Sequence, residues 1–186
     1  RIDWKARKGA KIAFIGRLSK EKNVDVLISA FKIVKKEHTE CELYIVGDGP
    51  LRGRLENMGK HIGALHFLGA LVHDETLRFL EGVDIFVLPS QFEVSPISVL
   101  EAMAKQIPVI VTPVGELPRV LENGKNCLFT KIGDANDLAM KISVVIEDKN
   151  LARKLAERGR KFVEEQHDAN KIIEKYITFY CGGKID

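Results

Sequence analysis

The chain has 186 residues, of which 45% are hydrophobic and 30% are charged, a composition typical of one soluble globular domain. The net charge of +3 is too small to indicate a nucleic-acid partner, and neither a signal peptide nor a run of membrane-spanning length is visible. Cys41, Cys127 and Cys181 show no CxxC pairing and no histidines at metal spacing, which argues against a disulfide framework and favours a reducing compartment.

Short apolar runs alternate with amphipathic segments along most of the chain. The apolar runs predict strands at 11–15, 43–46, 64–68, 84–88, 108–111 and 127–129. Helical spacing predicts helices after Asn23 and Asp74 as caps, through 51–58, and near 138–146, 151–162 and 170–180. Such alternation predicts an α/β fold: a Rossmann-like, doubly wound parallel sheet of about six strands with a helical C-terminal tail.

Two glutamates follow the predicted strand 84–88. Ser95 is a good N-cap and Pro96 suits the first helical position, which places Glu93 in a loop and Glu101 about one and a half turns into a helix. Open α/β sheets bind ligands at the carboxyl ends of their strands. Carboxylates receive hydroxyl donors well and phosphates poorly, so this pair indicates sugar or ribose binding. The alternative is two exposed glutamates without a role, which are common.

Basic residues follow the first strand. Glycine at Gly16 lets a ligand approach the backbone, while Arg17 and Lys22 supply positive charge beside a helix N-terminus. The functional interpretation is an anion site for a diphosphate. The alternative is a basic loop that is merely solvated, and Lys20 is predicted to be such a solvated residue. Gly47-Asp48-Gly49-Pro50 is better explained as a turn, and the GxGxxG fingerprint is missing from the first strand.

The histidines are scattered and form no catalytic pattern. His66 lies in an apolar strand and is predicted to be a satisfied core residue. No Ser-His-Asp or Cys-His arrangement is apparent. Glu164 and Glu165 are predicted to belong to a solvated helix face.

Several motifs together resemble a known family. They are Gly16-Arg17-Leu18 with Lys22, Gly47-Asp48-Gly49-Pro50, Phe67-Leu68-Gly69, Glu93 with Glu101-Ala102-Met103-Ala104, and Thr112-Pro113-Val114-Gly115. In this order the chain resembles the nucleotide-sugar-binding C-terminal domain of the group-4 retaining glycosyltransferases, which have the two-domain GT-B architecture. The motifs extend from about Lys11 to Asn126, and five in order are far more specific than one.

The resemblance implies a role for each motif residue. Glu93 matches the catalytic glutamate at the donor sugar. The residues matched to the donor's nucleotide and phosphates are Gly16, Arg17, Lys22, Leu71, Ser95, Pro96, Ile97 and Glu101. Arg17 and Lys22 match the diphosphate-binding pair, Glu101 the ribose acceptor, and Leu71 the backbone beside the base. The implied substrate is a UDP-, GDP- or ADP-linked sugar, in a mannosyltransferase-like reaction without a bound metal or other cofactor.

The chain also departs from the family pattern. Val94 and Cys127 stand where glycine is common, and Cys127 is predicted to be a small buried residue. Glu116 replaces a glycine and Arg119 replaces a glutamate. These two could pair at i,i+3 and keep their loop structural, or Glu116 could repel a phosphate.

In the family, an N-terminal Rossmann domain binds the acceptor, but only about ten residues precede the first strand here. We therefore expect residues 1–186 to form a single donor-binding domain, with residues 167–181 crossing toward the absent domain. The acceptor, a glycan or lipid, would bind to that domain. We expect a cytoplasmic enzyme, leaving open peripheral association of the full-length protein with the cytoplasmic membrane face. Alone, this half is expected to transfer sugar slowly or not at all.

Two other interpretations stay open. The chain could be a binding module with a degenerate site, of which Glu116 and Arg119 would be symptoms. It could also be half of an enzyme similar to the nucleotide-sugar epimerases that share the architecture. Neither the base, the sugar nor the acceptor follows from the sequence.

Overall fold

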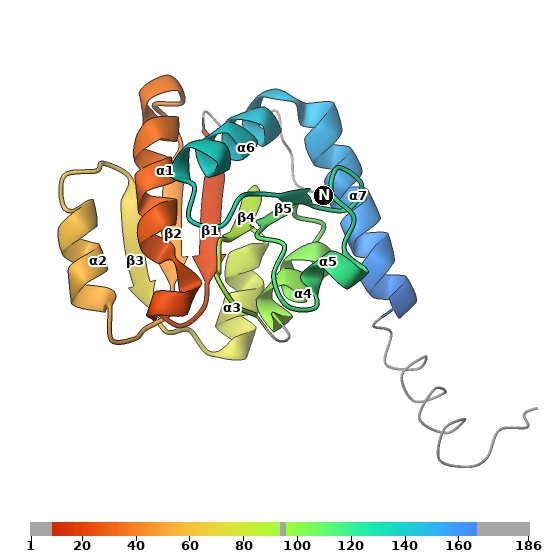
Figure 1. Cartoon of the computed structure of the whole chain (residues 1–186), viewed down its shortest axis with the longest axis horizontal. Coiled ribbons are helices and arrows are strands. Elements are labelled where there is room, and N and C mark those ends of the chain that lie inside the picture. The colour runs from red at the N-terminus through yellow and green to blue at the C-terminus, as the bar shows by residue number, and fades with distance from the viewer. Residues whose placement is uncertain (1–8, 94–95, 167–186) are drawn as a thin grey trace, which may run out of the picture.

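The computed structural model describes residues 9–93 and 96–166, and its centre is a parallel sheet (Figure 1). The six strands follow the order β3-β2-β1-β4-β5-β6. Their bounds are Lys11–Ile15 (β1), Glu42–Val46 (β2), Leu65–Gly69 (β3), Ile85–Leu88 (β4), Val109–Val111 (β5) and Leu128–Phe129 (β6). This confirms the predicted Rossmann-like sheet, and its order reverses between β1 and β4.

Helices cover the sheet. They are α1 (Val24–Glu37), α2 (Arg52–Gly59), α3 (His73–Leu80), α4 (Ile97–Ala104), α5 (Leu117–Val120), α6 (Ala135–Glu147) and α7 (Lys149–Gln166), with a 3-10 turn at Lys20–Lys22 (η1). Helix α1 packs against α2 and α6, and α4 packs against α7. Figure 1 shows α1 and α6 crossing the near side of the sheet. Within the described part of the chain, no helix is both long and apolar enough to cross a membrane.

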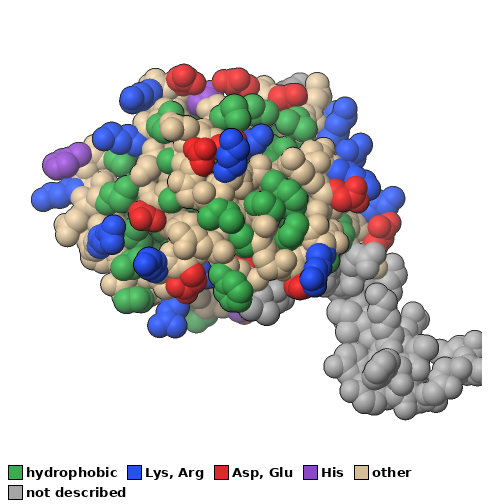
Figure 2. Space-filling view, viewed as in Figure 1, with side chains coloured by type: hydrophobic (Ala, Val, Ile, Leu, Met, Phe, Trp, Pro, Cys, Tyr) green, Lys and Arg blue, Asp and Glu red, His purple; other side chains and the backbone are tan. Residues whose placement is uncertain are grey.

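The core lies between the central strands and the helices. All residues of β4 and β5 are buried, because both faces of a parallel sheet are covered. From α1, Leu27, Ile28 and Phe31 are fully buried against the sheet, which explains their helical spacing. Each such side chain contributes about 1.5–3 kcal/mol by leaving water. Outside the core, Figure 2 shows basic and acidic side chains interspersed over the visible face.

The predicted helix starts need three corrections. Asn23 is the N-cap residue of α1, but its backbone is left-handed (φ 50°) and its side chain does not cap the helix. Asp74 lies in the first turn of α3 rather than at its cap, and the N–H of Val72 donates to the Glu75 carboxylate instead. Helix α4 begins at Ile97, with Pro96 as its N-cap residue. Local capping patterns are accurate only to a residue or two when a loop is held by tertiary contacts.

Two further predictions concern single side chains and the tail. His66 is not a core residue: its side chain is 41% exposed and stacks on Tyr44, because β3 is an edge strand. Ser95, Val94, Cys181 and the predicted segments 167–181 and 170–180 lie outside the described residues. The solvated face predicted around Glu164 is confirmed, since Glu164 is exposed and pairs with Arg160.

Candidate functional site

The candidate site lies where the strand order reverses. Chains leaving β1 and β4 diverge there, which is where an open α/β sheet forms a ligand crevice. Residues 16–23 follow β1, residues 89–93 follow β4, and residues 112–116 follow β5. These three loops contain Gly16, Arg17 and Lys22, then Glu93, and then the Thr112–Gly115 motif. The fold therefore places motifs that are far apart in the chain at one edge of the sheet.

Lys22 and Glu93 are in direct contact across these loops. The Lys22 Nζ atom lies 2.5 Å from Glu93 Oε1, and the Ser90 hydroxyl donates to the same oxygen at 2.7 Å. Glu93 is only 7% exposed, whereas the Lys22 side chain is 20% exposed. A carboxylate accepts at both oxygens, so Oε2 of Glu93 can receive a further hydroxyl donor. The sequence predicted both residues for the site but not their contact.

Hydrogen bonds hold the loop that carries Glu93 on both sides. The Asn23 side chain donates to the Pro89 carbonyl at 3.2 Å and accepts from Gln91 Nε2 at 2.9 Å. The N–H of Gln91 donates to the Glu21 carbonyl at 2.7 Å. On the other side, the Thr112 hydroxyl donates to the Ser90 carbonyl. These bonds explain why Asn23 does not cap α1: its side chain is used to join the β1 and β4 loops.

Gly115 packs directly on the main chain of Glu93. A Cβ atom at Gly115 would lie 1.8 Å from the Glu93 carbonyl oxygen, and the backbone of Gly115 is left-handed (φ 58°). Both facts require glycine at this position. The Thr112-Pro113-Val114-Gly115 motif therefore has a structural role in fixing Glu93, in addition to its place in the family pattern.

Glu101 contacts a different residue from the Lys22–Glu93 pair. The Glu101 Oε1 atom is 3.2 Å from Nδ1 of His73, the first residue of α3. Glu101 is 16% exposed and His73 is 69% exposed. The two glutamates are thus held by different elements, one by the β1 loop and the other by α3. His73 was grouped in the sequence with the scattered histidines, because nothing local connects it to Glu101.

The other predicted residues surround these two contacts. Gly16 donates its N–H to the Val46 carbonyl, and Gly47 approaches it so closely that a Cβ there would lie 1.9 Å from the Gly16 carbonyl oxygen. This close approach gives the Gly47 turn a structural explanation. Arg17 is exposed, and its guanidinium has no hydrogen bond or ion pair with another described residue.

The remaining residues of the candidate site lie at helix starts. Leu71 is half-buried two residues before α3, and Pro96 is half-buried at the start of α4. Ile97, the first residue of α4, is 65% exposed. The N–H groups in the first turn of a helix have no acceptor within the helix. In α4 the Val99 N–H donates to the Pro96 carbonyl at 3.0 Å, so the N–H groups of Ile97 and Ser98 are the ones that can bind a ligand oxygen.

The departures from the family pattern have structural roles. Arg119 Nη1 donates to both carboxylate oxygens of Glu116, at 2.9 and 3.2 Å, which confirms the predicted i,i+3 pair. Cys127 is fully buried as predicted, and burial raises the pKa of its thiol to about 12. The thiol is therefore a packing group and not a nucleophile at neutral pH.

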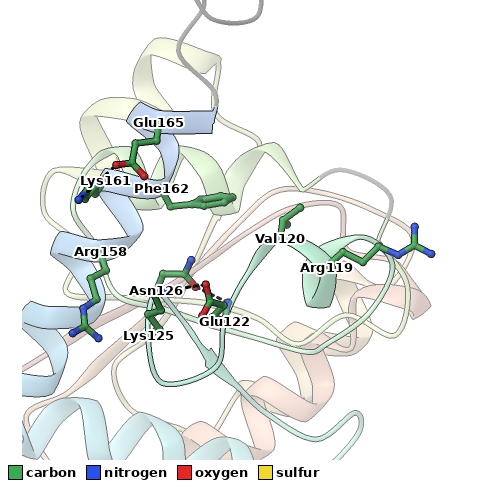
Figure 3. A pocket seen from close by; sticks show the side chains of 9 residues that line it. All are labelled: Arg119, Val120, Glu122, Lys125, Asn126, Arg158, Lys161, Phe162 and Glu165. Carbon is green, nitrogen blue, oxygen red and sulfur yellow. Dashed lines mark hydrogen bonds and ion pairs between the residues drawn. The ribbon is translucent and has the colours of Figure 1, made fainter. Parts of the chain in front are cut away.

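Two other features lie outside the switch point. A hollow of about 890 Å³ lies between α5, the loop after it and the C-terminal half of α7 (Figure 3). It is lined by Arg119, Val120, Glu122, Lys125, Asn126, Arg158, Lys161, Phe162 and Glu165. Ligating atoms of Glu37, His38 and Glu147 lie within 4.8 Å of one another, where α1 and α6 end. Helices that follow parallel strands end at the opposite sheet edge from the site, so this group is remote from Glu93.

The fold and the position of the site define a Rossmann-like domain of the kind that forms half of a GT-B enzyme. The family model described as "Glycosyl transferases group 1" matches residues 3–162. The chain belongs to this family of glycosyltransferases.

Known relatives agree with this assignment. N-acetyl-alpha-D-glucosaminyl L-malate synthase of Bacillus anthracis is 31% identical over 169 residues, which are 89% of this chain and 44% of that protein. The C-terminal domain of a group 1 glycosyltransferase, LpcC of Francisella tularensis, superposes with a TM-score of 0.80 at 24% identity, covering 86% of this chain and 87% of that one.

A further solved structure with a similar fold contains ligands. Anabaena HepE in complex with UDP and glucose gives a TM-score of 0.84 at 20% identity, covering 92% of this chain and 48% of that chain. The chain thus spans about half the length of the curated relatives that it matches. At this level of identity, the structural likeness establishes the fold.

Proposed function

We propose that the chain is the donor-binding half of a group-4, retaining glycosyltransferase that uses a nucleotide-diphosphate sugar. The observation that carries the proposal is the arrangement at the β1/β4 switch point. A lysine and a glutamate are paired there, Lys22 with Glu93, and a second glutamate lies on the following helix. A nucleotide sugar has the matching chemistry, since it combines an anionic diphosphate with two hydroxyl-rich sugars. The solved complex of HepE with UDP and glucose supports this choice.

We propose a place for each end of the donor, supported by these contacts. Lys22, with Arg17 beside it on the same loop, faces the diphosphate, and Glu93 next to Lys22 receives hydroxyls of the transferred sugar. Glu101 and His73 belong to α4 and α3, so the ribose lies toward these helices and the base toward Leu71. The two acidic residues therefore serve different parts of one ligand.

The charges have a simple role in transfer. When the bond between the anomeric carbon and the diphosphate breaks, negative charge grows on the leaving phosphate. Arg17, Lys22 and the N-terminal amides of α4 stabilise that charge, so no metal ion is needed for this task. Glu93 is held by Ser90 and Lys22 and orients the sugar from a fixed position. We propose that transfer retains the anomeric configuration.

The rest of the enzyme would supply the acceptor. Because the chain spans 44% of the length of its first curated relatives, we propose that a glycan or lipid acceptor binds to a further domain. In that case the full-length enzyme can associate peripherally with the cytoplasmic membrane face. The 186-residue chain alone should bind the donor but transfer sugar slowly or not at all. Rapid turnover by this chain alone would contradict the proposal.

Binding of a donor panel tests the proposal. Isothermal titration of the chain with UDP, GDP, ADP and their glucose, N-acetylglucosamine and mannose conjugates should find one preferred base. Absence of binding to any nucleotide would favour a degenerate site instead. That alternative draws on Glu116 and Arg119, although their mutual pairing leaves little net charge near the loop.

A further inference from the structure

His73 and Glu101 form a contact between two helices that are far apart in the sequence. The Nδ1 atom of His73 lies 3.2 Å from Oε1 of Glu101. Both side chains lie near the carboxyl edge of the sheet, since His73 begins α3 just after β3 and Glu101 is in the second turn of α4 after β4. The contact therefore lies at the edge where the ligand would bind.

The chemistry of the contact leaves the carboxylate available. Imidazole donates from Nδ1 either as the Nδ1–H tautomer or as the cation, and a carboxylate has about four acceptor sites on two oxygens. The ring of His73, 3.2 Å from Oε1, lies against one of the two oxygens and restricts rotation of the carboxylate. Glu101 can then accept two neighbouring hydroxyls, which is what a ribose presents at its 2′ and 3′ positions.

We propose that His73 is a positioning residue for ribose recognition: it holds the Glu101 carboxylate in the orientation that accepts the 2′- and 3′-hydroxyls of the donor nucleotide. This inference rests on the proposed function, and it adds a residue that no motif contains. His73 need not touch the ligand, because it acts through Glu101. Leu71 and Val72 precede it directly, so the same short segment would border both the base and the ribose.

A surface pair without a role is the rival explanation. Exposed ion pairs commonly contribute little to stability, and His73 is mostly exposed. Glu101, however, is mostly buried, and its carboxylate lies at the ligand edge of the sheet. The positioning role predicts that His73 affects recognition of the ribose hydroxyls, whereas a surface pair without a role predicts no such effect. Both explanations predict little effect on folding.

The test measures binding of UDP, GDP and ADP, and of their 2′,3′-dideoxy counterparts, to the 186-residue chain by isothermal titration. His73→Ala should weaken the preferred ribonucleotide about five- to tenfold while leaving the dideoxy form within about twofold, because only the ribose hydroxyls report on Glu101. His73→Asn places an amide N–H near the position of Nδ1 and should restore most of the affinity. His61→Ala removes another exposed histidine and serves as the matched control.

Each outcome decides the matter. Loss of ribonucleotide affinity that is absent with the dideoxy form, and rescue by asparagine, support the positioning role. An equal loss of affinity for both forms of the nucleotide, or no loss for either, overturns the positioning role of His73. Neither result contradicts the proposal that the chain binds a nucleotide-sugar donor. If the unaltered chain binds no nucleotide, the proposed function fails and this inference fails with it. Unfolding temperatures of the variants show that an affinity change is not a folding defect.

Discussion

Gly115 and Glu93 are packed main chain against main chain: a Cβ atom on Gly115 would lie 1.8 Å from the Glu93 carbonyl oxygen. The loop after β5 thus presses on the loop after β4 at the residue that the family pattern marks as catalytic. Ser90 and Lys22 hold the side chain of Glu93, and Gly115 holds its backbone. The carboxylate is therefore fixed from several directions before any ligand arrives.

Replacing Gly115 with alanine should displace Glu93. The left-handed backbone costs an alanine about 1–2 kcal/mol, and the clash with the Glu93 carbonyl adds to that cost. We expect a lower unfolding temperature and at least tenfold weaker binding of the nucleotide sugar. Gly133→Ala is the matched control, since Gly133 has φ 73° but no atom within 4 Å of its Cβ position. Equal behaviour of the two variants would show that the Glu93 contact has no importance for binding.

Arg17→Ala should lower the activity of the full-length enzyme, because the leaving diphosphate loses a positive charge. Removing one charged contact to a leaving group costs about 2–4 kcal/mol of transition-state stabilisation, which is seen as a loss in kcat/KM. Because the guanidinium is exposed, the unfolding temperature should not change. Lys20→Ala removes an exposed charge from the same loop and should leave both quantities unaltered. Unchanged nucleotide affinity and turnover in Arg17→Ala would contradict the diphosphate assignment.

Glu93→Gln and Lys22→Gln should have opposite effects on binding of a nucleoside diphosphate without a sugar. In Glu93→Gln, Lys22 loses its ionic partner and a negative charge leaves the site, so affinity should rise by about 1 kcal/mol, or about fivefold. In Lys22→Gln the diphosphate loses a cation, and affinity should fall by about 1.5–3 kcal/mol. Calorimetric titration with UDP, GDP and ADP measures both. A similar loss in the two variants would show that the pair acts only as a structural unit.

Asp134 tests a part of the fold that contributes no residue to the candidate site. Its carboxylate accepts from the N–H groups of Asn136 and Asp137, both at 3.0 Å, and so caps α6. Asp134→Ala should lower the free energy of unfolding by about 1 kcal/mol, as measured by urea denaturation, without changing nucleotide affinity. Asn136→Ala, in the first turn but with an exposed side chain, should have little effect.

The order and type of most elements follow from the sequence, because burial on both sides of a parallel sheet leaves a clear apolar pattern. The strand pattern at 84–88 and 108–111 corresponds to β4 and β5, which are buried throughout. The i,i+3 spacing of Glu116 and Arg119 was enough to predict their pair. The family motifs could likewise be found from the sequence alone, because each is a short run that contains a glycine or a charged residue.

The contacts within the site were decided only by tertiary structure. Lys22 reaches Glu93 across 71 positions of sequence, and Asn23 donates to Pro89 instead of capping its own helix. His73 gained its partner because α3 and α4 meet at one edge of the sheet. Local periodicity determines which face of an element is buried. Which polar groups meet depends on which strands are neighbours in the sheet. The spacing of residues along the chain does not determine that arrangement.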